Sequence, residues 1–425
     1  MLDPHFVREN PTLVKKNLSK KFQEYKNTIV DEFLQKDKEW RQIKTEVDKL
    51  RNERNKLSLD INNLKKEKKS PDKILTKVKT VVNLLTKKER LMHEAEQTSH
   101  NLLKKLPNTI HDSVPIGKDD TENPTIKELG KKPNFDFPIK NHVELGEALH
   151  ILDFDSSAKT SGNGFYFLHG KLAHLNRALL QFAVDFMEKK GYNYIEPPLL
   201  LRKEVLGAAI DLEEFEKTIY SIEKEDLALI GTSEHSLLGM HAGQVFHPEE
   251  LPKKYYSYSM CFRKEKGAHG INEKGLWRTH QFNKVEQFIF CKPEESYQMY
   301  DELLENSEEI LQLLDLPYRV IEICSGDLAA WKTKSADVEV WRPTINGYGE
   351  VMSLSNCTDY QARDLNIRFI TNDNKQIVHT LNNTALATSR ILVAIMENYQ
   401  QRDGSIHIPN ILQKYTGFKT IEREA

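Results

Sequence analysis

The chain has 425 residues, with 61 Lys or Arg against 63 Asp or Glu, so the formal net charge is −2. That length allows two or three domains with sizeable cores, and the balanced charge excludes a uniformly basic protein but not a local basic patch. The four cysteines lack zinc-site spacing, no apolar run is long enough to cross a membrane, and the N-terminus has no signal-peptide pattern, so we expect a cytoplasmic protein with no membrane association, no zinc and reduced core thiols at Cys261, Cys291, Cys324 and Cys357.

Residues 29–106 are predicted to form a long antiparallel helical hairpin. The first half carries a seven-residue repeat in which eight of ten seam positions are apolar, as in a coiled coil. Its seam residues are Phe33, Lys36, Trp40, Ile43, Val47, Leu50, Arg54, Leu57, Ile61 and Leu64. Ser70 and Pro71 suit the start of a second helix. Its seam, again eight of ten apolar, is Ile74, Val78, Val81, Leu85, Lys88, Met92, Ala95, Ser99, Leu102 and Leu106.

The turn of this hairpin is basic. Residues 65–79 contain seven lysines and two acidic residues, which gives a local charge of +5. Such a tip suits contact with a phosphate backbone. A spacer or a protein-docking coiled coil with a solvated lysine-rich turn explains the same pattern, and the arm alone leaves both readings open.

The rest of the chain has a different pattern. Prolines and polar residues over 108–138 predict a linker between an N-terminal domain, 1–107, and a mixed α+β domain, 139–425. Helical patterns run over 171–190, closed by Gly191, and over 294–315, and strand-like runs lie between them. The sequence has neither a P-loop motif nor a G-x-G-x-x-G motif.

The segment CFRKEKGAHGINEKGLWRTHQFNKVEQF, residues 261–288, predicts a hairpin with an unusual polar face. Alternation places Arg263 and Glu265 on one face of the first strand. The same alternation gives the return strand a face made of Arg278, His280, Phe282, Lys284, Glu286 and Phe288. Paired guanidinium groups suit a polyphosphate and an aromatic plane suits a purine. A surface ladder of ion pairs is the alternative reading.

This hairpin resembles motif 2 of the class II aminoacyl-tRNA synthetases in the form found in the seryl-tRNA synthetase family. GYNYIEPPLL (191–200) is similar to motif 1, and LNNTALATSRILVAIMENYQQRDGSIHIP (381–409) is similar to motif 3. GTSEHSL (231–237), GEVMSLSNCTDYQARDLNIRF (349–369) and NPTLVKKNLSKK, which precedes the arm, also resemble that family. The resemblance covers essentially the whole chain and implies an antiparallel sheet flanked by helices.

The resemblance also implies an activity and a site. Family members activate L-serine with ATP and pass the seryl group to the 3′ end of tRNA(Ser), and the sequence leaves open whether tRNA(Sec) is served too. The implied catalytic residues are Arg263, Arg278 and Arg390. The implied serine-binding residues are Thr232, Ser233, Glu234, Glu286 and Thr384. The implied ATP-binding residues are Arg263, Lys264, Glu265, Thr279, Phe282, Glu350, Val351, Met352, Ser353 and Arg390.

Further expectations follow from the same resemblance. Mg²⁺ would be held by Glu350 and Ser353, tRNA would be contacted at the tip of the arm, and a homodimer would form through motif 1. The tip residues in question are Lys65, Lys66, Lys68, Lys69 and Lys73. Asn383 stands where the family usually has glycine, and asparagine can adopt the left-handed conformation that glycine favours, so the turn can survive the difference. The alternatives are an RNA-binding relative without catalysis, a relative that charges a carrier protein, and a coiled-coil scaffold with a vestigial domain.

Overall fold

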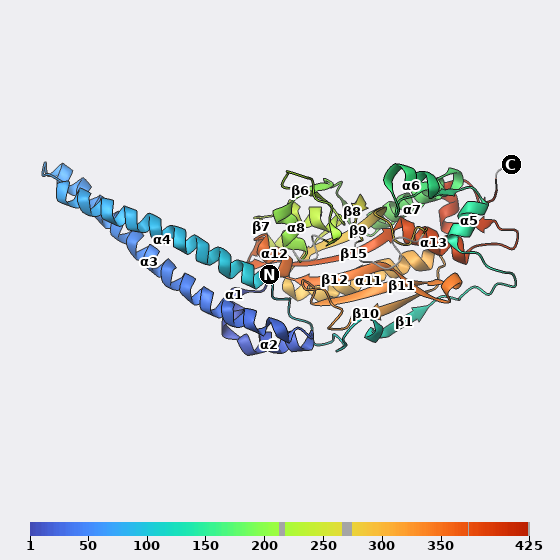
Figure 1. Cartoon of the computed structure of the whole chain (residues 1–425), viewed down its shortest axis with the longest axis horizontal. Helices are drawn as coiled ribbons and strands as arrows, with labels where there is room; N and C mark the ends of the chain where they lie inside the picture. The colour runs from blue at the N-terminus through green and yellow to red at the C-terminus, as the bar shows by residue number, and fades with distance from the viewer. Residues whose placement is uncertain (212–216, 266–273, 373, 424–425) are drawn as a thin grey trace. The chain divides into compact units, whose positions relative to one another are not determined.

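The computed structural model describes residues 1–211, 217–265, 274–372 and 374–423. The chain divides into two compact units (Figure 1). The smaller unit spans Leu2–Pro107, and the larger unit comprises Asn108–Ala425 together with Met1. Each unit has its own packing and is described by itself.

The smaller unit is helical. Two short helices, α1 (Pro4–Glu9) and α2 (Pro11–Lys20), precede the long helices α3 (Asn27–Lys66) and α4 (Asp72–Lys104). Helices α3 and α4 run side by side as an antiparallel hairpin (Figure 1). All twenty predicted seam residues are buried or half-buried, and most of the residues between them are exposed, so the predicted coiled coil is confirmed.

The turn between the two long helices also follows the prediction. Helix α4 begins directly after Pro71, and the Ser70 hydroxyl accepts a hydrogen bond from the Asp72 N–H at 3.3 Å. Lys69 pairs with Glu67 at 2.8 Å. The five lysines predicted for the tip are all exposed: Lys65, Lys66, Lys68, Lys69 and Lys73. The turn therefore presents a positive surface to solvent.

The larger unit is built on one eight-stranded sheet. Its strand order is β1-β10-β11-β12-β15-β9-β8-β4, and every neighbouring pair is antiparallel except β4 and β8. The bounds in that order are Thr125–Leu129, Tyr318–Glu322, Lys334–Arg342, Gly347–Thr358, His379–Ala387, Gln281–Cys291, Lys253–Phe262 and Asn193–Tyr194. The predicted α+β class, with an antiparallel sheet flanked by helices, is confirmed.

The two faces of this sheet have different neighbours. One face, which includes Val285 and Ile289, shares a core with the helices α7 (Gly170–Lys189), α11 (Ser296–Leu313) and α13 (Thr388–Asn398). The other face includes Phe288 and Phe290 and packs on residues of α8 (Lys203–Ala209), α10 (Glu234–Met240) and α12 (Tyr360–Asp364). Strict alternation along β9 separates these two sets of side chains, so Phe282, Lys284 and Glu286 belong to the second face.

The remaining elements are short. The helices are α5 (His142–Ala148), α6 (Asp155–Ser161) and α14 (Gln413–Thr416). The small sheets comprise β2 (Leu152–Asp153), β3 (Phe167–Leu168), β5 (Leu200–Arg202), β6 (Leu227–Leu229), β7 (Val245–Phe246), β13 (Arg368–Ile370), β14 (Lys375–Ile377), β16 (Ile406–His407) and β17 (Thr420–Ile421). The four cysteines are buried and unpaired, as expected of reduced core thiols.

The segment 108–138 does more than connect two domains. It contains β1, which pairs with β10 at the edge of the main sheet. Ile110 and Val114 pack with Ile321, Ile323 and Leu328 in a separate small core. This part of the segment is therefore packed within the larger unit. Over the part of the chain that the structure describes, no helix is both long and apolar enough to cross a membrane.

Candidate active site

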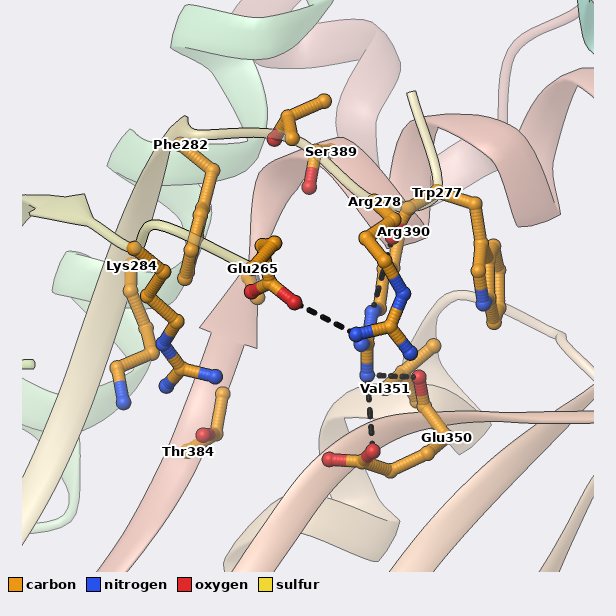
Figure 2. A pocket seen from close by; sticks show the side chains of 13 residues that line it. Glu265, Trp277, Arg278, Phe282, Lys284, Glu350, Val351, Thr384, Ser389 and Arg390 are labelled. Carbon is orange, nitrogen blue, oxygen red and sulfur yellow. Dashed lines mark hydrogen bonds and ion pairs between the residues drawn. The ribbon is translucent and has the colours of Figure 1, made fainter. Parts of the chain in front are cut away.

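A pocket opens on the second face of the main sheet, where the ends of β8, β9 and β15 lie near the start of α13 (Figure 2). Nine residues predicted for the site line it: Arg263, Glu265, Arg278, Thr279, Phe282, Glu350, Val351, Thr384 and Arg390. The other lining residues are Trp277, Lys284, Ala387 and Ser389. The structure thus brings together three arginines that are as far as 127 positions apart in the sequence.

The predicted single polar face of the hairpin is only partly correct. Strand β8 ends at Phe262 and β9 begins at Gln281, so Arg278 lies in the connection and not in the return strand. Glu265 also leaves the strand pattern, because its φ is +49°. Its carboxylate reaches Arg278 Nη1 at 2.6 Å (Figure 2). Residues 266–273 of the connection, with two of its three glycines, lie outside the described residues.

The three arginines are held in different ways. Arg263 donates from Nε to the carbonyl of Gly231 at 3.2 Å, and its guanidinium carbon lies 5.3 Å from the centre of the Phe282 ring. Arg390 Nη1 contacts the Glu350 carbonyl at 2.7 Å and the Glu350 carboxylate at 3.1 Å (Figure 2). Guanidinium groups stay charged at any working pH, so the pocket carries fixed positive charge beside an aromatic plane.

Deeper in the same face lies a buried acidic group. Lys284 Nζ pairs with Glu286 Oε2 at 2.6 Å, and the Thr384 hydroxyl donates to the same oxygen at 3.4 Å. Glu234, at the start of α10, accepts a hydrogen bond from Gln361 Nε2 at 2.8 Å. Burial, and then the nearby negative charge of Glu286, raise the pKa of Glu234 to about 7. Charged groups of both signs therefore meet in a site with little access to water.

The other two residues predicted to bind serine lie next to Glu234. Thr232 and Ser233 are buried at the start of α10, and the Thr232 hydroxyl accepts from the Glu234 N–H at 3.3 Å. Thr232, Ser233, Glu234 and Glu286 do not themselves line the pocket. Their roles in binding serine stay predictions.

A β-bulge explains the spacing of Glu350 and Ser353. On β11 and β12, Asp337 pairs with Ser353 and Glu339 pairs with Glu350, which leaves Val351 as an extra residue. In a regular strand, positions i and i+3 point to opposite faces, but one extra residue returns them to the same face. Asp337 joins them there as a cross-strand neighbour.

The pKa values of the Asp337 and Glu350 carboxyl groups are shifted in opposite directions. Burial, and then the Glu350 carboxylate, raise the pKa of Asp337 to about 7. Burial opposes ionisation of Glu350, but the guanidinium of Arg390, together with the charges of Arg263 and Lys332, lowers the pKa of Glu350. Asp337 Oδ1 is buried and has no hydrogen-bond partner among the residues that the structure describes. A cation beside Glu350 would satisfy that oxygen and favour ionised Asp337.

Three predicted ATP-binding residues are not among those that line the pocket: Lys264, Met352 and Ser353. Met352 belongs to the large core cluster together with Val338, its partner across the strands. The backbone N–H of Lys264 donates to the Thr218 carbonyl at 2.8 Å. Their proposed contacts with ATP stay predictions.

Asn383 does not need the left-handed conformation that asparagine can share with glycine. Asn383 lies within β15, pairs regularly with Gln287, and is not among the residues with positive φ. Its amide donates to the Leu303 carbonyl at 2.8 Å and to the Ser307 hydroxyl at 2.7 Å, both on α11. The Asn383 side chain therefore points to the face covered by α7, α11 and α13. Thr384 and the pocket lie on the opposite face, because neighbouring residues of a strand point to opposite faces.

Among the residues of the site that were not predicted to have a role in it are Lys284, Trp277 and Asp337. Lys284 was already on the predicted polar face, and its contact with Glu286 gives it a place there. Trp277 precedes Arg278, but no strand or helix pattern marks it. Asp337 lies in a D-x-E-x-W stretch, and only the strand pairing places it beside Glu350 and Ser353.

Comparisons with known proteins agree with this architecture. Residues 215–399 match the tRNA synthetase class II core domain of the G, H, P, S and T group, and residues 1–110 match the seryl-tRNA synthetase N-terminal domain. The fold is that of a class II aminoacyl-tRNA synthetase. The serine--tRNA ligase of Methanoregula boonei is 44% identical, over 98% of this chain and 98% of its own.

Solved structures extend the similarity to the whole length. A seryl-tRNA synthetase from Pyrococcus horikoshii complexed with ATP is 42% identical with a TM-score of 0.91, and the match covers 100% of both chains. A cytoplasmic serine-tRNA ligase from Naegleria fowleri in complex with AMP is 30% identical with a TM-score of 0.86, covering 100% of this chain and 99% of the other. The chain belongs to the seryl-tRNA synthetase family.

Proposed function

We propose that this chain is a serine--tRNA ligase. It joins L-serine to AMP from ATP, releases diphosphate, and transfers the seryl group to the 3′ end of tRNA(Ser), with tRNA(Sec) left open as a second acceptor. The observation that carries the proposal is the meeting of Arg263, Arg278 and Arg390 around a pocket that Lys284, the ion-pair partner of the buried Glu286, also lines.

The first step needs alignment and charge neutralisation. A carboxylate oxygen of serine attacks the α-phosphorus, a new C–O–P linkage forms, and the bond to the diphosphate breaks. No general base is required, because the attacking carboxylate is already ionised. Arg263 bridges the serine carboxylate and the α-phosphate, and Arg278 and Arg390 hold the outer phosphates. Charged donors set in place before reaction stabilise the transition state without reorganisation.

The purine end of ATP is assigned to the aromatic part of the pocket. Adenine stacks on Phe282, with Arg390 on its other face and Glu265 near the adenosine. The position of the Phe282 ring in the pocket wall supports this assignment, and its contact with Arg263 places a cation beside the same ring. Thr279 and Val351 complete the walls.

Recognition of serine is assigned to the buried acidic group. Glu234 holds the ammonium group of serine, and Glu286 accepts a hydrogen bond from the serine hydroxyl, beside Thr232, Ser233 and Thr384. Alanine would leave the buried polar atoms unpaired, which is a large penalty, whereas threonine is rejected only by the bulk of one methyl group. We therefore expect alanine to be excluded more strongly than threonine.

Mg²⁺ fits the oxygen atoms at the bulge. Mg²⁺ in nucleotide sites uses one or two carboxylates together with phosphate oxygens, and the bulge presents Glu350, Ser353 and Asp337 on one face. The orphaned Asp337 Oδ1 suits a cation. When bound, the ion neutralises charge on the phosphates. Glu350 also anchors Arg390, so this chain ties its phosphate-binding arginine to its proposed cation site.

The second step uses the smaller unit. The exposed lysines of the tip contact the phosphate backbone of tRNA, and the arm selects an acceptor with a long extra arm. The domain division that we propose is 1–107 for tRNA binding, 108–138 as a connection and 139–425 for catalysis. Since tRNA charging supplies translation, we assign the protein to the cytoplasm.

A homodimer through motif 1 is also proposed. Three apolar side chains of that region are partly open to solvent in the single chain: Tyr194, Leu199 and Leu200. Adjacent exposed apolar side chains are typical of a surface that pairs with another chain. Closed two-fold dimers are the most common assembly of soluble oligomers.

Exchange of labelled diphosphate into ATP tests the activation step. We expect exchange with serine, much weaker exchange with threonine, and none with alanine. Arg263→Ala should reduce the serine-dependent rate by about a hundredfold or more, the size of effect seen when a charge-stabilising donor is removed. Arg402→Ala, an exposed arginine paired with Asp136, is the control. Absence of exchange with every amino acid would favour an RNA-binding relative without catalysis.

A further inference from the structure

A buried ionic network lies behind the pocket, at the far end of α13 from Arg390. Glu397 accepts hydrogen bonds from Arg342 at 3.2 and 2.9 Å and from the Thr344 hydroxyl at 2.8 Å, and it pairs with His142 Nδ1 at 3.0 Å. Its side chain is fully buried. Burial alone would raise the pKa of Glu397, but the hydrogen bonds from His142 and Arg342 lower it to about 2. The carboxylate is therefore ionised at every working pH.

His142 links this carboxylate to the connection that carries Arg278. Its Nε2 atom accepts a hydrogen bond from the Leu276 N–H at 3.1 Å. A neutral imidazole with its proton on Nδ1 satisfies both contacts, donating to Glu397 and accepting from Leu276. The imidazole thus holds the backbone two residues before Arg278.

Gly275 makes this approach possible. A Cβ atom built at Gly275 would lie 2.9 Å from His142 Nε2, which is too close for the present geometry. The glycine therefore lets the backbone come within hydrogen-bond distance of the imidazole. An alanine at the same position would push the two apart.

Trp277 lies between the ionic network and the pocket and contacts an arginine of each. The guanidinium carbon of Arg342 lies 4.3 Å from the centre of the indole, and that of Arg390 lies 5.5 Å from it. Arg390 Nε also donates to the Trp277 carbonyl at 3.2 Å. A Cβ atom at Gly349 would come within 2.3 Å of the indole, so the ring fits closely against the backbone beside Glu350.

We infer that His142 is a positioning residue for ATP: with Glu397 and Arg342 it sets the place of Trp277 and Arg278 at the phosphate end of the pocket. The inference rests on the proposed function, since it deepens the role of that same site. Helix α13 carries Arg390 at one end and Glu397 at the other, so one rigid element ties the network to the pocket. Small displacements of charged groups at such a site have large effects on binding and rate.

The inferred effect is selective for ATP. Apart from Arg263, which the proposal shares between serine and the α-phosphate, the residues assigned to serine lie in β9, in β15 and at or just before the start of α10. The network instead contacts the connection before Arg278 and the start and end of α13. Loss of His142 should therefore weaken the binding of ATP and leave the binding of serine nearly unchanged. Substitution of a residue that served only general stability would change neither the KM for ATP nor the KM for serine, or would change both by the same factor.

The experiment compares His142→Ala with His241→Ala. His241 is also buried and also uses both ring nitrogens, with Gln244 at 2.6 Å and Tyr255 at 3.1 Å, but it belongs to the other face of the sheet. We expect His142→Ala to raise the ATP dissociation constant, measured by calorimetry, and the KM for ATP by about tenfold, the usual scale for one lost buried hydrogen-bonding group. The KM for serine should change less than about twofold, within the range of an unaffected site.

Gly275→Ala keeps the experiment decisive if His142→Ala does not fold. It retains the imidazole and should raise the ATP dissociation constant in the same direction. Equal ATP affinity in wild type and Gly275→Ala, or equal changes in His142→Ala and His241→Ala, would overturn the inference. Calorimetry needs no turnover, so it remains informative if the wild type shows no serine-dependent exchange. That last result would reject the proposed function instead.

Discussion

Glu234 is the residue at which pH should control the site. Its pKa is raised to about 7, against about 4.5 for an ordinary glutamate, by burial and then by Glu286. A raised carboxyl pKa means that the folded chain holds the proton more tightly, so ionised Glu234 becomes available only as the pH rises through 7. Serine binding by an ionised Glu234 should therefore strengthen with pH.

We predict that the KM for serine falls by up to about tenfold per pH unit between pH 6 and 7 and levels off above 8, as a single ionisation requires. Glu234→Gln should raise the KM for serine by about tenfold to a hundredfold, the range for a hydrogen bond to a charged group, and should remove this pH dependence. Glu308→Gln, a buried glutamate on α11 that bonds Tyr318, is the control. A flat profile in the wild type would show that Glu234 does not hold the ammonium group.

The sequence predicted which residues form the site more accurately than it predicted how those residues are arranged. Arg263, Arg278 and Arg390 were predicted to act together, and all three line one pocket. Arg278 was predicted to lie in a strand, but the return strand begins only at Gln281. Residue alternation cannot reveal where a strand starts, because that depends on which partner residues are available for hydrogen bonding.

The bulge between β11 and β12 is the element that assembles the proposed cation site. It aligns Asp337 with Glu350 and Ser353, and Asp337 is the member not predicted from the sequence. Pairing between strands is a long-range property, so no local pattern around Val351 marks the extra residue.

We predict that EDTA abolishes diphosphate exchange and that excess Mg²⁺ restores it. Asp337→Asn should raise the Mg²⁺ concentration for half-maximal exchange by about tenfold, a scale typical of groups that tune a metal site. Asp315→Asn, on the turn after α11, is the control. An unchanged Mg²⁺ requirement in Asp337→Asn would remove this residue from the site.

The arm is the element that the sequence predicted most completely. Every seam residue is buried or half-buried, including the polar Lys36, Arg54, Lys88 and Ser99. A coiled-coil pattern repeats locally and needs one partner of the same kind, which is why it can be read directly. What the tip binds cannot be read in this way, since exposed lysines fit several partners.

We predict that replacing the tip lysines by alanine lowers kcat/KM for tRNA by about tenfold or more at physiological salt, because each lost phosphate contact reduces the electrostatic part of binding. The residues to change together are Lys65, Lys66, Lys68, Lys69 and Lys73. Diphosphate exchange should be unaffected, since it needs no tRNA. The control changes exposed lysines along the stem, namely Lys38, Lys49, Lys56 and Lys87. Equal losses in both variants would mean that total charge matters and the tip does not.

At the scale of the whole molecule, we predict a dimer. A single chain of 49.3 kDa leaves Tyr194, Leu199 and Leu200 partly exposed. Sedimentation equilibrium at micromolar concentration should give a mass near twice that of one chain. Leu200→Asp should shift the mass toward one chain, because a charge placed in an apolar interface is costly. A single-chain mass for the wild type would contradict the assignment of motif 1 as the interface.

The two units differ in how far the sequence alone could describe them. The arm follows from a repeat, whereas the sheet joins strands that are distant in the sequence, such as β1 with β10 and β15 with β9. The segment 108–138 illustrates the difference, because its proline-rich composition predicted a linker and gave no sign that β1 would pair within the sheet. Resemblance to a family supplied the order of the motifs, and the fold supplied their contacts.

We propose above all that this chain attaches serine, and no other amino acid, to tRNA. The most direct measurement incubates the wild-type protein with ATP, Mg²⁺, total tRNA and all twenty amino acids, and then identifies by mass spectrometry the aminoacyl-adenosine released from tRNA by nuclease digestion. We expect seryl-adenosine as the only enriched species, from a tRNA with a long extra arm. Enrichment of another aminoacyl-adenosine, or of none, would contradict it.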